Sequence, residues 1–83
     1  MPRNAPVEYD PTEDILYVRL KRAPVSWTKP VDDQRLVDYA SDGSVIGVEF
    51  IAASSGVDLA GIPMRTELEA LIAASDAPVR LVA

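Results

Sequence analysis

Apolar and polar residues alternate over most of the first two-thirds of the chain, the pattern of strands with one buried face. The clearest case is LVDYASDGSVIGVEF at residues 36–50, where two alternating runs meet at Asp42-Gly43. Asp-Gly between such runs predicts a β-hairpin with a two-residue turn, because both residues tolerate the positive φ that this turn requires. The residues expected to share its buried face are Val37, Tyr39, Ile46, Val48 and Phe50, with Tyr39 opposite Ile46 and Val37 opposite Val48.

Two other interpretations of this stretch are weaker. A loop one residue longer on one strand would place Asp38 beside Ile46 on the apolar face, since a one-residue slip turns every side chain to the other side. The run from Asp38 to Glu49 also resembles a calcium-binding loop of the EF-hand type. Ala40 stands at its third position without a ligand oxygen, and the flanks alternate as strands do. We therefore interpret the stretch as a hairpin.

Further strands are predicted before and after the hairpin. Residues 7–9 form a short strand, residues 10–14 a turn begun by Asp10-Pro11, and residues 15–20 a strand inside the sheet, because both of its faces are partly apolar. Residues 25–31 form another strand, which Pro30 confines to an edge. Residues 79–82 are expected to be a final short strand that pairs with an edge of its own sheet or of a neighbour.

After Ile51 the spacing of apolar residues becomes helical. Pro63 suits the first turn of a helix, and Asp76-Ala77-Pro78 ends it. The stripe that faces the sheet is predicted to be Met64, Leu68, Leu71, Ile72 and Ser75. The expected fold is therefore α+β: an antiparallel β-meander of about five strands, one C-terminal amphipathic helix packed on it, and a short terminal strand. We expect one domain over residues 1–83, with residues 1–6 frayed.

Composition excludes several kinds of chemistry. The 83 residues include neither cysteine nor histidine. Ser-His-Asp and Cys-His catalysis, disulfides and the usual zinc ligand sets all require an imidazole or a thiolate. The sequence therefore predicts a protein that is not an enzyme and that has neither a cofactor nor a bound metal.

Charge indicates the kind of partner. Eight Lys and Arg against 13 Asp and Glu give a net charge of -5 and a pI of about 4.4. Such a field repels phosphates, so we expect no direct nucleic-acid partner and favour a small basic protein. The N-terminus lacks the apolar segment of a signal peptide and no apolar run is long enough for a membrane span, so a cytoplasmic protein without membrane contact is expected. A chain this short often gains stability by self-association, which predicts a homodimer.

Three residues are candidates for binding. Trp27 stands in the predicted edge strand, and tryptophan is enriched at interface hot spots, although a lone tryptophan in a small domain more often belongs to the core. It supports a protein-binding module. Asp38 and Glu49 would share the polar face of the hairpin near Gly47 and support the alternative, a small-ligand binder or a carboxylate-based enzyme.

The chain also resembles a known family over residues 7–53. The residues that carry the resemblance are Tyr9-Asp10-Pro11, Asp14, Leu16 to Leu20, Val37-Asp38-Tyr39, Asp42-Gly43 and Val45 to Phe50. They are similar to DUF2283, a family of small bacterial proteins of unknown function. The resemblance implies a β-meander with a helix across it, and it implies an antitoxin-like role beside a small basic toxin-like protein. It assigns a function to no single residue.

Overall fold

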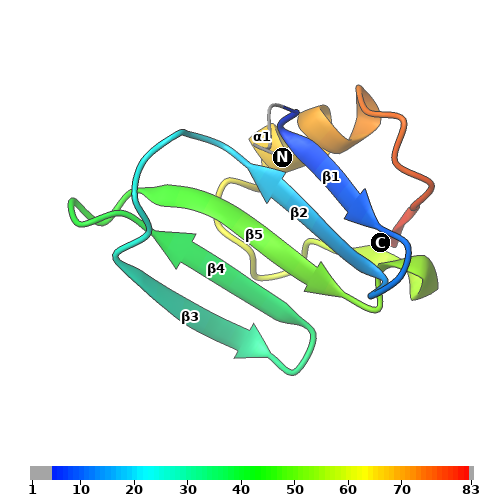
Figure 1. The fold of residues 1–83 in the computed structure, drawn as a ribbon, viewed down its shortest axis with the longest axis horizontal. Coiled ribbons are helices and arrows are strands. Elements are labelled where there is room, and N and C mark those ends of the chain that lie inside the picture. Colours follow the sequence, from blue (N-terminus) through cyan, green and yellow to red (C-terminus); the bar gives the residue numbers. More distant parts are fainter. Residues whose placement is uncertain (1–4, 83) are drawn as a thin grey trace.

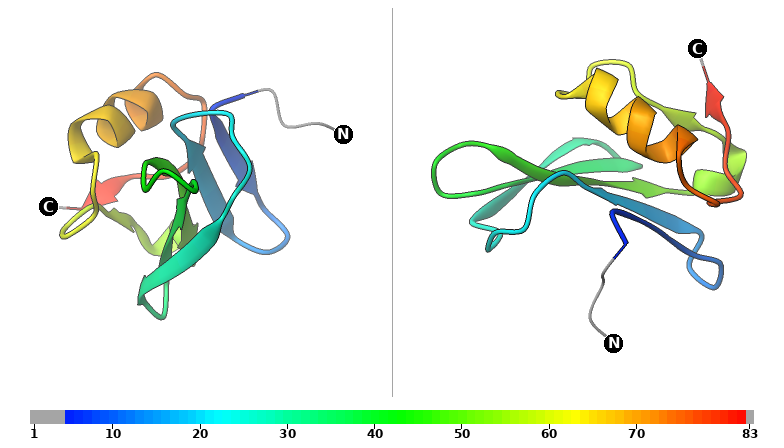
Figure 2. Two further views of the ribbon diagram at one scale, coloured as in Figure 1. Left: turned by 90° about the vertical axis from the view of Figure 1, so that its left-hand side faces the viewer. Right: turned by 90° about the horizontal axis from the view of Figure 1, so that it is seen from above.

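The computed structural model describes residues 5–82 as one antiparallel sheet with a helix and a small strand pair on one face (Figures 1 and 2). The five strands are β1 (Val7–Asp10), β2 (Ile15–Arg19), β3 (Trp27–Asp32), β4 (Arg35–Tyr39) and β5 (Val45–Ile51). Their order across the sheet is β1-β2-β5-β4-β3, so β2 is an interior strand and β3 an edge strand. The predicted α+β fold is confirmed.

The start of the chain is tied to the sheet earlier than expected. Of the residues predicted to be frayed, 1–4 lie outside the described part of the chain. Pro6 does not fray, because its carbonyl accepts a hydrogen bond of 2.7 Å from the N–H of Arg19. A proline loses only its donor, so its carbonyl can still extend a ladder.

The central hairpin forms, but its turn differs from the prediction. Ala40 accepts from the N–H of Gly43 at 3.0 Å and donates its own N–H to the carbonyl of Ser44 at 2.9 Å, so the loop is one residue longer than predicted. Gly43 has φ 84°, the left-handed residue that follows the turn in a three-residue loop. Tyr39 therefore lies opposite Val45 rather than Ile46. The register shift between Asp38 and Tyr39 absorbs the difference, and Val37 lies opposite Val48 as predicted.

The second layer is formed by everything after β5. It contains a 3₁₀ turn at Ala53–Ser55, β6 (Val57–Asp58), α1 (Arg65–Ala73) and β7 (Leu81–Val82). β6 and β7 pair in parallel, with Val57 opposite Leu81. The terminal strand thus pairs within its own chain, with a segment that the alternation does not mark as a strand.

The helix begins later than its apolar stripe suggests. Met64 precedes it with φ 61° and is 44% exposed, so the prediction that Met64 faces the sheet is wrong. Pro63 accordingly lies before the first turn rather than in it. Leu68 and Ile72 are buried, as the stripe predicts, and Leu71 packs against them at the margin.

One hydrophobic core lies between the two layers. The sheet contributes Leu16, Val18, Val37, Val48 and Phe50, and the covering layer contributes Ala53, Val57, Leu59, Ile62, Leu68 and Ile72. In the left view of Figure 2, α1 lies over the β1 and β2 end of the sheet and β3 lies at the other end, away from the helix. All six residues of β3 are exposed. The fold therefore has a covered half and a bare half.

Candidate functional site

The bare half carries an exposed aromatic pair. Trp27 is 48% exposed and stacks on Tyr39, the residue opposite it on β4, with 4.2 Å between ring centroids and 11° between ring planes. Val25 and Val31, two residues before and four residues after Trp27 in the chain, are also exposed, at 50% and 38%. The sequence allowed two interpretations of Trp27, and the one that buries it in the core is wrong. The structure holds its ring in place by Tyr39 and leaves its outer face open to solvent.

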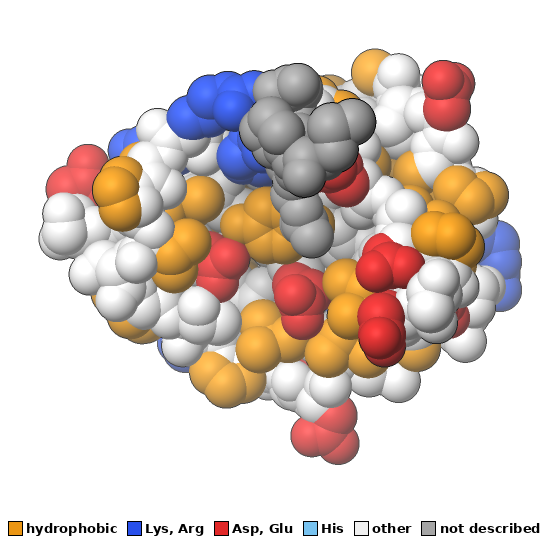
Figure 3. Space-filling view, viewed as in Figure 1, with side chains coloured by type: hydrophobic (Ala, Val, Ile, Leu, Met, Phe, Trp, Pro, Cys, Tyr) orange, Lys and Arg blue, Asp and Glu red, His pale blue; other side chains and the backbone are white. Residues whose placement is uncertain are grey.

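Asp38 and Glu49 alternate along their strands with the buried Val37 and Val48. They therefore lie on the face of the sheet opposite the helix, which is the face that Figure 3 shows. Asp38 lies opposite Gly47, and Glu49 lies two pairs further along the ladder, opposite Leu36. The predicted shared face is thus confirmed. Acidic side chains gather among hydrophobic ones over the middle of this face (Figure 3).

Asp38 is held by its neighbours. One carboxylate oxygen accepts a 2.8 Å hydrogen bond from the Tyr17 hydroxyl, and the other accepts a 2.6 Å hydrogen bond from the Thr28 hydroxyl. The three residues come from three different strands, so Asp38 fastens β2 and β3 to β4 across the sheet. Its oxygens are engaged in holding the sheet together, which leaves less capacity for a ligand.

Gly47 is required by the same contact. A Cβ at this position would lie 2.6 Å from a ring carbon of Tyr17 and 2.6 Å from the backbone oxygen of Val18. The absent side chain therefore makes room for the Tyr17 ring on its way to Asp38. Gly47 therefore serves a contact within the protein.

Glu49 borders a hollow that does not include Asp38. The hollow has a volume of about 400 Å³ and is lined by Glu8, Tyr9, Asp10, Pro11, Ile15, Tyr17 and Glu49. Glu8 and Glu49 flank Tyr17 on the strands beside it. A site in which Asp38 and Glu49 act together is therefore not formed by one cavity of the described residues.

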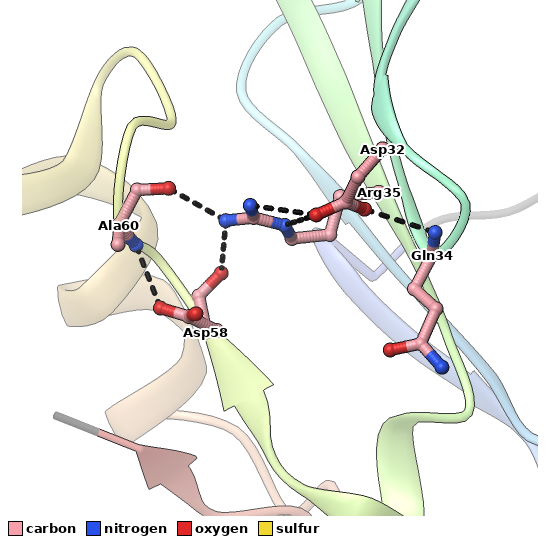
Figure 4. Close-up of polar contacts among 5 residues, drawn as sticks. All are labelled: Asp32, Gln34, Arg35, Asp58 and Ala60. Atoms are coloured by element: carbon pink, nitrogen blue, oxygen red, sulfur yellow. Dashed lines mark hydrogen bonds and ion pairs between the residues drawn. The ribbon is translucent and has the colours of Figure 1, made fainter.

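Arg35 forms a hydrogen-bonded clamp that sequence reasoning missed (Figure 4). Its guanidinium donates to one carboxylate oxygen of Asp32 at 2.8 and 3.0 Å, and to the carbonyls of Asp58 and Ala60 at 3.0 and 2.6 Å. The Arg35 hydrogen bond, together with the N–H of Gln34, lowers the pKa of Asp32. The sequence could have indicated this clamp. Arg35 continues the face of Val37 and Tyr39, and a charge on that face requires partners.

Asp14 forms a second clamp, between the first turn and the end of β5. It accepts hydrogen bonds from the Ser54 hydroxyl at 2.6 Å, the Tyr9 hydroxyl at 2.7 Å and the Ser54 N–H at 2.9 Å. These bonds favour the charged carboxylate, the Ser54 hydroxyl most, and lower its pKa, while the bond to Asp14 raises the pKa of Tyr9. Asp14 has φ 57°, a left-handed conformation that aspartate tolerates better than most residues.

The described residues contain no group of three or more acidic, histidine or cysteine side chains that could hold a metal ion. Within residues 5–82, no helix has both the length and the apolar character needed to cross a membrane.

The sheet, the helix that covers it and these clamps define a small α+β domain whose polar clusters connect its own strands and turns. The chain belongs to the family described as Protein of unknown function (DUF2283), whose family model matches residues 7–54. That match covers β1 to β5 and ends within the 3₁₀ turn, so the helix and the β6–β7 pair lie outside it. No curated protein and no solved structure matches the chain.

Proposed function

We propose that this protein is a small binding module that holds another protein through the surface formed by Val25, Trp27 and Val31. The observation that carries the proposal is the Trp27 ring, 48% exposed and stacked on Tyr39. An aromatic ring held in one orientation loses little conformational freedom on binding, and such rings are frequent interface anchors.

The partner that suits this module is a small basic protein. The net charge of -5 would speed the encounter with a basic chain, and the apolar surface around Trp27 would slow its release. This is the role that an antitoxin-like protein has beside a basic toxin-like one. We also propose that the protein is cytoplasmic and that it forms a homodimer. Sedimentation equilibrium tests the homodimer, for which we expect a mass of twice 9.0 kDa.

The alternative function at the Asp38 and Glu49 face has less support. Both oxygens of Asp38 accept hydrogen bonds from the protein, and the hollow at Glu49 excludes Asp38. General acid–base catalysis needs a group within hydrogen-bonding reach of the substrate proton. We therefore retain the proposal that the protein is not an enzyme.

The test is capture of the partner followed by measurement of its affinity. The tagged protein is recovered from cells of its source organism, and native mass spectrometry identifies any bound chain. We expect a basic chain, and we expect Trp27→Ala to weaken its binding at least about tenfold by calorimetry, as hot-spot truncations do.

Leu81→Ala is the matched control. Leu81 is also exposed, at 37%, but lies in β7 on the second layer, away from β3. It should leave the affinity unchanged. Equal binding by the Trp27→Ala protein, or loss of its folded structure, would contradict the proposal.

A further inference from the structure

A groove runs between β1 and the segment that follows α1. Its volume is about 660 Å³, in the range of ordinary ligand sites. One wall is formed by Ala5, Pro6, Val7, Tyr9 and Pro11, and the other by Leu71, Ala74, Ser75, Asp76, Ala77 and Pro78. Figure 1 shows β1 at the edge of the sheet, with the chain after the helix descending beside it.

The backbone of β1 presents a free edge to this groove. Pro6 accepts from Arg19 of β2, and in an antiparallel ladder the residues that bond one neighbour alternate with those that point away. Glu8 and Asp10 therefore bond β2, while the N–H and C=O groups of Val7 and Tyr9 point outward. Among residues 5–82, no backbone hydrogen bond outside the ladders uses these groups.

The opposite edge of the sheet differs in this respect. The N–H of Ile51 donates to Gln34 at 2.7 Å, so the same alternation makes Leu36 bond β5 and Val37 bond β3. Pro30 lies opposite Leu36, and its nitrogen therefore points to the outer edge of β3. A proline there removes a donor from the free edge, a device that protects edge strands from further pairing. Of the two edges, β1 is the one equipped to pair with another strand.

We propose that an extended segment of a basic protein binds in this groove by adding a strand to the outer edge of β1. The outward groups of Val7 and Tyr9 supply the strand hydrogen bonds, and the apolar walls receive the side chains that point toward the helix. This surface lies at the other end of the sheet from Trp27. The inference therefore stands independently of the function proposed for Trp27.

Charge selects a basic segment as the occupant. Asp76 is the only charged residue of the groove walls, and the last turn of α1, beside it, contains no basic residue. A helix carboxyl end without a cation attracts positive charge. A second copy of this chain is disfavoured in this groove, because the two-fold pairing that uses Val7 and Tyr9 of both β1 strands places Glu8 opposite Glu8.

The test uses a capped hexapeptide of alternating lysine and valine as the probe, with the glutamate–valine peptide as its counterpart. Amide resonances of the isotope-labelled protein are followed as each peptide is added up to about 5 mM, a range suited to weak binding. We expect the lysine peptide to shift the Val7 and Tyr9 amides and to slow their hydrogen exchange. The glutamate peptide should change neither.

Two variants distinguish the effect of charge in the groove from the effect of the net charge of the protein. Asp76→Lys should weaken binding of the lysine peptide about five- to tenfold, because the substitution reverses the charge at the groove wall. Asp33→Lys makes the same change of net charge in the exposed turn between β3 and β4, and should weaken it less than about twofold.

Any of three outcomes of the peptide measurements would overturn the proposal. They are no shift at Val7 and Tyr9, equal binding of the two peptides, or equal weakening by the two variants. Protection of the Val7 and Tyr9 amides in a dimer without peptide would also overturn it and assign the groove to a second copy. None of these outcomes depends on Trp27, so the two proposals fail separately.

Discussion

The covered half of the sheet and the bare half are built from similar alternating strands but differ in how far their apolar residues are buried. Under the helix, Leu16, Val18 and Phe50 are at most 2% exposed. At the other end, Trp27 is 48% exposed, although its partner Tyr39 lies two residues from the buried Val37, on the same face of the sheet. Alternation thus decides which side a residue points to, and the second layer decides whether it is buried.

Size explains why one half stays bare. The helix has nine residues, so it is about 14 Å long and about 10 Å wide, while five strands span about 19 Å between their outer axes. One short helix covers part of such a sheet, and the β6–β7 pair covers some of the rest. The uncovered part is available for binding. Four substitutions, taken from the largest expected effect to the smallest, test this division.

Leu68→Ala should have the largest effect, because Leu68 is fully buried between α1 and the sheet. Removing its side chain leaves a cavity, and we expect a loss of about 2–5 kcal/mol in the free energy of unfolding measured with urea. Val31→Ala, on the bare half, should cost less than about 1 kcal/mol. Similar losses in both variants would mean that the two halves are equally covered. If Leu68→Ala fails to fold, Ile72→Val tests the same core with an expected loss of about 0.5–1.5 kcal/mol.

Arg35→Lys should have the next largest effect, because Arg35 connects β4 to the carbonyls of Asp58 and Ala60 in the second layer. Its side chain is 15% exposed and reaches Asp32 and two carbonyls at once, which the single ammonium of lysine cannot do. We expect a loss of about 1–3 kcal/mol by urea unfolding. Arg65→Lys, at the exposed start of α1, is the control and should change stability little. Equal effects would show that the clamp does not hold the two layers together.

Much of the covered half could be predicted from sequence, because the spacing of apolar residues along the chain indicates which residues share a face. The strands of the sheet and the burial of Leu68 and Ile72 follow from it, whereas the edge position of β3 was predicted from Pro30. The Tyr39 pairing could not be settled in this way. A two-residue turn and a three-residue loop with Gly43 both suit Asp-Gly, and only the backbone of the turn distinguishes them.

The binding candidates were predicted less well, since each depends on contacts between distant segments. The pairing of β6 with β7 joins residues 57–58 to 81–82; a terminal strand at residues 79–82 was predicted, but no local pattern marks residues 57–58 as its partner. Asp38 was predicted on the correct face, but its bonds to Tyr17 and Thr28 depend on the strand order β2-β5-β4-β3. The groove beside β1 is likewise formed by the two ends of the chain.

Asp14→Asn should have a smaller effect that depends on pH. The pKa of Asp14 is lowered from 3.8 by its bonds to Ser54 and Tyr9, so it stabilises the fold above that value and the contribution disappears as pH falls through the lower, folded-state pKa. Asparagine keeps a side-chain oxygen but does not titrate. We expect the urea midpoint of the variant to fall less between neutral pH and acid than that of the natural protein. Asp33→Asn, in the exposed turn, should keep the natural profile, and a profile unchanged by both substitutions would contradict the assignment.

Trp27→Ala should have the smallest effect on stability and so gives the sharpest test of the bare half. Trp27 loses its stacking with Tyr39 and only part of its buried surface, for which we expect about 0.5–1.5 kcal/mol. The measurement is urea unfolding followed by circular dichroism, since the substitution removes the tryptophan fluorescence. Tyr39→Phe, which keeps a stacked ring, should cost less than the alanine variant. A loss near that of Leu68→Ala would mean that Trp27 belongs to the core. A small loss would mean that the exposed Trp27 ring contributes little to the stability of the fold. That result is expected if the ring serves binding.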